Sequence, residues 1–240
     1  MWPAGAGRRA VRRSAPALTG AGDLRKHLTM ARLRKAARVW RSRDARAAAE
    51  QVMVATDAAA FILDLAALFD RSAPLEVELG AGRGDFIIER AAANPERNFL
   101  AVELAGSVAR VLAARAGRRE LSNLRVLQAD ARTIVNLLMP DAAVAVYHIY
   151  FPDPWPKARH EKHRMMSPSM AAGIARTLIP GGTIHVASDV EEWAAAMFAM
   201  LCEAGFVRIG GEAAGARFTG FARKYIAAGK PIFAASFRRF

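Results

Sequence analysis

The chain has 240 residues, of which 53% are hydrophobic and 24% charged, a composition typical of one globular domain with its own core. A single cysteine, Cys202, excludes an intramolecular disulfide framework and a cysteine-based structural zinc site, and it favours a reducing compartment. The apolar stretches are too short, or interrupted by a charge, for a membrane span of roughly 18–20 apolar residues. We therefore expect a soluble cytoplasmic protein.

The net charge of +13 is concentrated at the amino-terminal end. Residues 1–46 hold 13 Lys and Arg residues against 2 acidic residues, whereas residues 47–240 hold 22 against 20. A basic arm of this kind gains affinity for nucleic acid by neutralising phosphates and releasing counterions. An organellar targeting peptide or a solubilising tail are the alternatives. We divide the chain into a basic, partly disordered arm at 1–45 and a globular domain at 46–240.

Residues 45–70 are rich in alanine and have apolar residues three and four positions apart, which predicts one or two helices outside the main sheet. From Leu75 onward, short apolar runs alternate with helical segments, a pattern that indicates βαβ units and a mostly parallel sheet. A turn is expected at the Pro-Gly-Gly sequence 180–182, and the last two strands, near Phe206 and at 231–237, are expected to form a hairpin. The predicted fold is α/β, with seven strands of which one is antiparallel.

The first chemical motif is ELGAGRGD at residues 78–85, between a predicted strand and a predicted helix. Glycines at alternate positions allow a tight turn and let a ligand approach bare main chain at a helix amino terminus. A dinucleotide site is an alternative, although that fingerprint has Gly or Ala where this chain has Asp85. Glu78 favours S-adenosylmethionine, because a cationic amino acid ligand without a pyrophosphate suits a neighbouring carboxylate.

Two further acidic residues are predicted at strand ends. Glu103 closes the strand NFLAVEL, where a carboxylate can accept hydrogen bonds from both hydroxyl groups of a ribose. Asp130 closes the next strand, where it can accept a hydrogen bond from the exocyclic amino group of adenine. A helix N-cap or a solvated strand end is the alternative for each acid. Three acids at the ends of successive strands nevertheless indicate the crevice in which open α/β sheets bind ligands.

The segment HIYFPDPWPK, residues 148–157, has three prolines in five residues. Each proline fixes its own φ near about −65° and restricts the residue before it, so Asp153 is expected in a stiff, extended loop at a strand end. A carboxylate held in this way can meet a ligand with little loss of entropy. The alternative is a rigid connecting loop in which Asp153 caps a helix.

A cationic segment follows, KARHEKHR at residues 157–164. Beside a cofactor crevice, such a segment favours contact with a phosphodiester, and a solvated loop is the alternative. His160 and His163 are three residues apart, but no carboxylate or third histidine accompanies them at the spacing of metal ligands. We therefore expect no metal.

From about Pro74 to its carboxyl terminus, the chain resembles the bacterial tRNA (guanine-N7-)-methyltransferases. The resemblance rests on ELGAGRG, NFLAVEL, SNLRVLQAD, FPDPWPKARHEKHR and GGTIHVASD, and the proline-rich motif is highly specific to that family. It implies a Rossmann-like, class I S-adenosylmethionine-dependent methyltransferase fold. The implied activity is methyl transfer to guanine N7 in the tRNA variable loop, usually at tRNA position 46.

The resemblance also assigns roles to residues. Asp153 matches the family's proposed catalytic aspartate. The implied cofactor-binding residues are Glu78, Gly80, Gly82, Gly84, Glu103, Asp130 and Asp153. The implied substrate-binding residues are Lys157, Asp189, Thr219 and Phe221, and the implied RNA-contacting residues are Arg159, His160, Lys162, His163 and Arg164.

One substrate motif departs from the family pattern. The family has T-x-F-E in a late loop, where this chain matches Thr219 and Phe221 but has Ala222 in place of the glutamate. The departure leaves room for a methyltransferase-like RNA-binding protein that has lost catalysis. A nicotinamide-dependent oxidoreductase is a third interpretation, which Asp85 disfavours. The sequence fits a monomer or a homodimer equally well.

Overall fold

The computed structural model describes residues 43–54, 62–155, 159, 163–210 and 214–240, so nearly all of the predicted arm lies outside the described residues. Within these ranges, eight strands form one sheet in the order β1-β4-β3-β2-β5-β6-β8-β7. The strands are β1 (Met53–Val54), β2 (Leu75–Leu79), β3 (Asn98–Glu103), β4 (Leu124–Gln128), β5 (Val144–Tyr150), β6 (Leu178–Ser188), β7 (Phe206–Arg208) and β8 (Phe233–Arg239).

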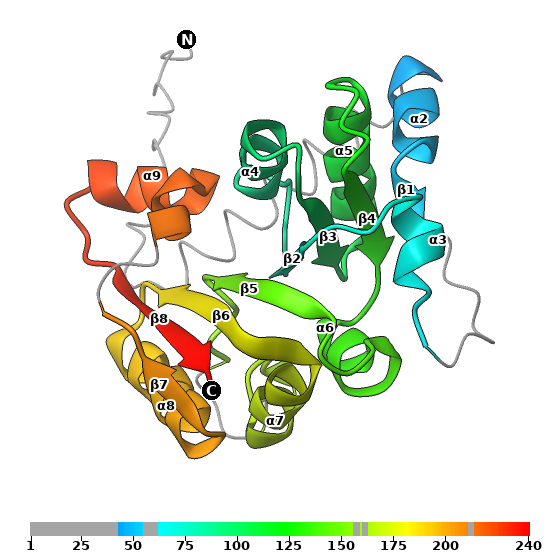
Figure 1. The fold of residues 1–240 in the computed structure, drawn as a ribbon. Coiled ribbons are helices and arrows are strands. Elements are labelled where there is room, and N and C mark those ends of the chain that lie inside the picture. Colours follow the sequence, from blue (N-terminus) through cyan, green and yellow to red (C-terminus); the bar gives the residue numbers. More distant parts are fainter. Residues whose placement is uncertain (1–42, 55–61, 156–158, 160–162, 211–213) are drawn as a thin grey trace, which may run out of the picture.

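Helices cover both faces of this sheet (Figure 1). Helices α4 and α5 lie on one face and α7 and α8 on the other, while α9 lies over the same face as α4 (Figure 1). The helices are α2 (Arg43–Glu50), α3 (Leu65–Phe69), α4 (Ile87–Ala93), α5 (Gly106–Gly117), α6 (Ala131–Thr133), the π-helix η1 (Ile134–Leu138), α7 (Pro168–Thr177), α8 (Glu191–Glu203), the 3₁₀-helix η3 (Ala214–Phe218) and α9 (Gly220–Ala227).

The strand directions confirm the predicted α/β architecture. All pairs from β1 to β6 are parallel, and β8 is antiparallel to both of its neighbours, β6 and β7. Only one described strand therefore runs against the others, as predicted. The last two strands do pair antiparallel, but η3 and α9 lie between them in the chain, so the expected hairpin connection is wrong.

The strand count is one higher than predicted because β1 extends the sheet. Met53 pairs with Val126 and Val54 with Leu127, parallel to β4. The alanine-rich region 45–70 therefore does not lie wholly outside the sheet. Its helix α2 packs against α5, and Ala45 and Ala49 are buried there. Small side chains allow the two helix backbones to come close together.

The predicted turn at 180–182 is part of a strand instead. Strand β6 continues through these residues, and its pairing with β5 shifts from Val144–Leu178 to Val146–Thr183. The three residues are accommodated as an irregularity in the ladder, where Gly181 has a φ of 76°. A bulge provides the same backbone freedom as a turn without ending the strand.

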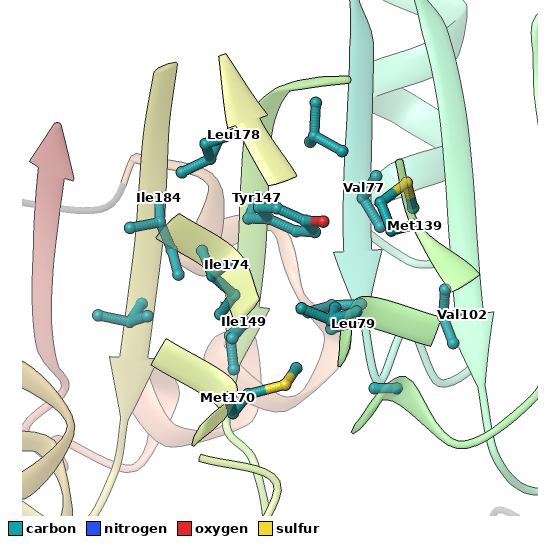
Figure 2. Packing of buried hydrophobic residues seen from close by; sticks show 14 of the residues in the cluster. Val77, Leu79, Val102, Met139, Tyr147, Ile149, Met170, Ile174, Leu178 and Ile184 are labelled. Carbon is teal, nitrogen blue, oxygen red and sulfur yellow. The ribbon is translucent and has the colours of Figure 1, made fainter. Parts of the chain in front are cut away.

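The apolar core has one layer on each face of the sheet. One layer joins β2, β5 and β6 to α7 and α8, and Figure 2 shows Tyr147 and Ile149 of β5 close to Ile174 and Met170 of α7. In the same layer, Trp193 of α8 is buried. The other layer joins the central strands to α2, α4 and α5. Because β2 is covered on both sides, all five of its residues are buried, including two glutamates.

Local sequence signals explain the ends of several helices. Ser167 accepts a hydrogen bond from the amide of Met170 at 3.2 Å, and Pro168 follows at the first position of α7. Two acidic residues lie in the first turn of α8, where they interact favourably with the helix dipole.

No helix in the part of the chain that the structure describes has the length and apolar character of a membrane span. The same part of the chain has no group of three potential metal ligands.

Candidate functional site

A cavity of about 420 Å³ lies where the parallel strands end. The carboxyl ends of β2 to β5 meet at this edge, as is usual for ligand sites in open α/β sheets. The cavity is lined by Leu79, Gly80, Gly82, Val102, Glu103, Leu104, Ala105, Val108, Ala129, Asp130, Ala131, Arg132, Tyr150, Phe151, Pro152, Asp153, Trp155, His163 and Met165.

Most of the predicted cofactor residues reach this cavity. Those that line it are Gly80, Gly82, Glu103, Asp130 and Asp153. The other two, Glu78 and Gly84, do not line it. Glu78 lies in β2, just before the glycine loop, and Gly84 packs against Leu112 of α5.

The glycine loop follows β2 and turns sharply towards α4. The amides of Gly80 and Ala81 both donate to the carbonyl oxygen of Val102, at 2.8 and 3.0 Å. Gly82 has a φ of 58° and Gly84 a φ of 72°, which are values that favour glycine. Gly80 and Gly82 line the cavity, and a Cβ at Gly82 would meet nothing within 4 Å, so the main chain is bare at that residue.

We expect Gly84→Ala to lower the free energy of unfolding more than Gly82→Ala does. Both substitutions place a side chain at positive φ, which costs about 1–2 kcal/mol. A Cβ at Gly84 would also lie 2.6 Å from Cγ of Leu112, whereas a Cβ at Gly82 meets nothing within 4 Å. Such overpacking adds about 1–3 kcal/mol.

Urea denaturation of both variants measures this difference. Gly229→Ala is the matched control, because Gly229 has a φ of 64°, meets nothing within 4 Å and lies away from the cavity. Equal losses for Gly82→Ala and Gly84→Ala would contradict the packing argument.

Glu103 is fixed in position by the backbone around it. Its Oε2 accepts a hydrogen bond from the amide of Gly82, and its Oε1 accepts one from the amide of Ala105, both at 2.8 Å. A carboxylate oxygen has capacity for more than one hydrogen bond. Both oxygens of Glu103 therefore keep capacity to accept a further hydrogen bond, while its ribose-binding role stays a prediction.

Glu78 is a buried carboxyl group at the base of the loop. Burial raises the pKa of Glu78 well above its usual value, and the negative charges of Asp85 and Glu103 raise it further. A hydrogen bond from the amide of Ile87, at the start of α4, opposes this shift. Its Oε2 atom is buried and has no hydrogen-bond partner among the described residues. A cationic ligand beside the loop would lower the free energy of the ionised form.

Asp130 caps a helix in addition to lining the cavity. It accepts a hydrogen bond from the amide of Arg132 at 2.9 Å, and the Arg132 side chain donates to both of its oxygens. The side-chain hydrogen bond from Arg132 lowers the pKa of Asp130. The N-cap considered as an alternative from the sequence is therefore present. An adenine amino group would share this carboxylate with Arg132.

The proline-rich loop follows β5 and places Asp153 at the cavity. Asp153 is exposed, and Pro152 before it is buried. The amide of Phe151 donates to the carbonyl oxygen of Ala187 at 2.8 Å, which attaches the start of the loop to β6. Phe151 and Trp155 have φ values of 55° and 40°, so residues other than glycine adopt the left-handed region on both sides of Asp153.

Only part of the predicted cationic segment is described. Lys157, His160 and Lys162 lie outside the described residues. Arg159 and His163 are exposed, and the ring of His163 lies 5.4 Å from that of Trp155. The structure thus places His163 at the cavity wall.

The late substrate motif begins a helix that the sequence analysis did not predict. Thr219 is the N-cap of α9, and its hydroxyl accepts a hydrogen bond from the amide of Ala222 at 3.0 Å. Phe221 is buried, and its ring lies 4.9 Å from that of Phe151, which lines the cavity. Helix α9 therefore packs directly against the wall of the site.

Ala222 occupies the third position of α9 and is fully buried. A glutamate there would complete a capping box with Thr219, which this chain lacks. The first residue of α9, Gly220, lies close to Asp85 at the end of the glycine motif. A Cβ at Gly220 would lie only 2.3 Å from Oδ2 of Asp85. Asp189 follows the end of β6, at the same edge of the sheet, but does not line the cavity.

A buried polar network behind the site was missed by the sequence analysis. Glu76 is paired with Arg90 at 3.0 Å, Arg97 at 2.7 Å and His148 at 3.0 Å. His148 in turn shares a hydrogen bond of 2.9 Å with the hydroxyl of Tyr150, a residue of the cavity wall. Burial lowers the pKa of His148, and a neutral imidazole that donates to Glu76 accepts the Tyr150 hydroxyl hydrogen at Nδ1.

The only sequence signal for this network is a charged residue at alternate positions of the apolar strand LEVEL. Two glutamates on one face of a central strand need partners, because a buried carboxylate without them is costly. The partners are distant in sequence and cannot be assigned from it.

Comparison with known proteins identifies the family. The family model Methyltransf_4, which describes methyltransferases, matches residues 72–233. The chain belongs to this methyltransferase family. Two curated proteins that are similar to this chain are named tRNA (guanine-N(7)-)-methyltransferase. That of Psychromonas ingrahamii is 41% identical over 140 residues, 58% of each chain, and that of Sodalis glossinidius is 40% identical over 153 residues, 64% of each chain.

The chain thus spans less than two thirds of the length of these relatives. Their names confirm the family resemblance seen in the motifs. Among solved structures, the 16S rRNA methyltransferase KamB aligns with a TM-score of 0.55 at 19% identity, over 74% of this chain and 93% of that chain. At this identity the likeness concerns the fold alone, and it confirms the predicted class I methyltransferase fold.

Proposed function

We propose that the chain transfers the methyl group of S-adenosylmethionine to N7 of a guanine in the tRNA variable loop, usually at tRNA position 46, forming 7-methylguanosine. The observation that carries the proposal is that Glu103 and Asp153 line one cavity, at the ends of β3 and β5. The names of the two relatives support the choice of substrate.

The residues present fit S-adenosylmethionine. The cavity volume of about 420 Å³ lies within the range of roughly 300–1,000 Å³ that small-molecule sites have. Glu103 is held by two backbone amides with capacity left for a ribose. Glu78 does not line the cavity, but its carboxyl group lies just before the glycine loop and favours a cationic amino group there through its charge. Asp130 and the apolar side chains of Leu104 and Val108 line the part of the wall where an adenine would lie.

When bound, S-adenosylmethionine supplies a methyl group on a positively charged sulfur. Guanine N7 has an in-plane lone pair and no proton, so the reaction needs no general base. The protein's contribution is then positioning and electrostatics. The Asp153 carboxylate favours the transition state because positive charge moves towards the purine, and it can also accept hydrogen bonds from the N1 and N2 donors of guanine. The other proposed substrate contacts are Lys157, Asp189, Thr219 and Phe221.

The cationic segment is the proposed RNA contact of the domain. Arg159 and His163 are exposed, His163 lines the cavity, and Lys157, His160 and Lys162 belong to the same segment. Contacts with phosphates would position the RNA and make its binding dependent on salt. The basic arm at 1–45 is proposed to add affinity in the same way, beside the methyltransferase domain at 46–240. Such an enzyme works in the cytoplasm.

Incubation of the protein with radiolabelled S-adenosylmethionine and unmodified tRNA transcripts tests the proposal. One set of transcripts keeps the variable-loop guanine and the other has adenine there. We expect label only in the first set, and aniline cleavage, which reports 7-methylguanosine, only at that guanine. Label at another base would contradict the proposed position and identify that base as the methylated one. Cofactor binding without label in any transcript would favour the RNA-binding protein without catalysis.

A further inference from the structure

The loop that presents Asp153 adopts an unfavourable backbone conformation. Phe151 and Trp155 both have positive φ values, 55° and 40°, and both are bulky residues without the freedom of glycine. Two prolines between them restrict the remaining torsions. Such a conformation persists only where surrounding groups hold it, and it is often found at functional sites.

Arg164 makes the contacts that hold the second half of this loop. Its Nε donates to the carbonyl oxygens of Pro154 and Trp155, at 3.2 and 3.3 Å, and its Nη2 donates to that of Trp155 at 3.1 Å. The planar guanidinium group thus bridges two consecutive carbonyl groups immediately after Asp153. A lysine ammonium is a point charge and cannot reproduce this fork.

Trp193 of α8 supports the guanidinium from the core. The Cζ atom of Arg164 lies 5.1 Å from the centre of the Trp193 ring, within the distance of a cation–π interaction. Trp193 is buried with 5% of its surface exposed, and it belongs to the apolar layer beneath β5 and β6. Arg164 is therefore a connection between the rigid core and the loop.

We propose that Arg164 is a positioning residue that holds Asp153 at the cavity, in addition to any contact with RNA. The inference rests on the proposed function, because Asp153 acts there on the guanine. It predicts that the geometry of the guanidinium, and not only its charge, determines the rate of methyl transfer. A displacement of about 1 Å at a reacting group can slow a reaction about 100-fold.

Arg164→Lys tests this role because it keeps the charge and removes the fork. We expect the single-turnover rate at saturating tRNA to fall by about 10- to 100-fold. The Michaelis constant for tRNA and its dependence on salt should stay within about twofold of wild type. The matched control is Arg208→Lys, since Arg208 lies on β7, away from the cavity, with its guanidinium 5.3 Å from the Phe198 ring.

Hydrogen exchange of the peptide that includes residues 151–155 gives a readout independent of activity. Exchange should accelerate at least about 10-fold in Arg164→Lys and remain unchanged in Arg208→Lys, because the loop loses its two carbonyl contacts. Unchanged exchange, or a raised Michaelis constant with an unchanged rate, would overturn the positioning role. If exchange accelerates in Arg164→Lys but the wild-type protein transfers no methyl group, Arg164 does hold the loop. In that case the proposed function is refuted instead.

Discussion

Replacing Asp153 with Ala is expected to lower the rate of methyl transfer by about 100- to 1,000-fold, the effect of removing one electrostatic contact to a developing charge. This exposed carboxylate lines the same cavity as Glu103, on a loop whose conformation leaves it little freedom. Positive charge develops on the guanine only as the methyl group arrives. A nearby anion therefore stabilises the transition state more than the bound substrates.

Affinity for the cofactor should change much less, because Glu103 and the glycine loop provide most of the proposed contacts. Single-turnover kinetics and the dissociation constant of S-adenosylhomocysteine measure the two quantities separately. Asp153→Asn removes the charge and keeps the shape, and should lose most of the same rate. The control is Asp141→Asn, since the Asp141 side chain is 74% exposed and outside the cavity wall. Equal losses of rate and cofactor affinity would instead make Asp153 a cofactor-binding residue.

The sequence predicts the fold well where hydrophobic pattern alone determines an element. The strands β2 to β6 follow from apolar runs that alternate with helical segments, because each strand buries a continuous face. The strand β1 has only two residues, too few to produce a pattern. Helix α9 begins at Gly220, a weak helix former, which lowers the helical signal of this short segment in the sequence.

For the site, the sequence predicts which residues gather but not how they are held. The acids Glu103, Asp130 and Asp153 come together because parallel strands end at one edge of the sheet. The hydrogen bonds that fix them depend on side-chain directions, and the sequence gives no sign that Arg164 turns towards the loop carbonyls. Charge suggested a phosphate contact for that residue, whereas in the structure it donates to backbone carbonyl oxygens and lies over an indole ring.

A large effect on stability is expected at Glu76, a fully buried carboxylate in the central strand β2. Burial by itself would raise the pKa of Glu76, but hydrogen bonds from His148 and Arg90, together with the charge of Arg90, outweigh it and lower that pKa to about 2. The carboxylate is therefore ionised at neutral pH. Removing one partner of a buried ion pair leaves the others without compensation, which costs about 3–5 kcal/mol.

We expect Glu76→Gln to lower the free energy of unfolding by about 3 kcal/mol, the lower end of that range. The arginine side chains are 40% and 27% exposed and can regain water, whereas His148 cannot. The matched control is Glu89→Gln, since Glu89 and Arg119 form a pair with side chains 59% and 43% exposed. An exposed pair contributes up to about 1 kcal/mol. Urea denaturation followed by tryptophan fluorescence measures both.

The pH dependence gives a second test with a defined sign. Because the pKa of Glu76 falls from its ordinary value of 4.5 to about 2 on folding, its contribution to stability is complete above pH 4.5 and declines as the pH falls towards 2. Glutamine does not titrate, so the stability difference between wild type and Glu76→Gln should narrow over that interval. A difference that is constant from pH 7 to 3 would mean that the network does not depend on the ionised carboxylate. A narrowing difference would show that the ionised carboxylate stabilises this network, which His148 extends from Glu76 to Tyr150 in the cavity wall.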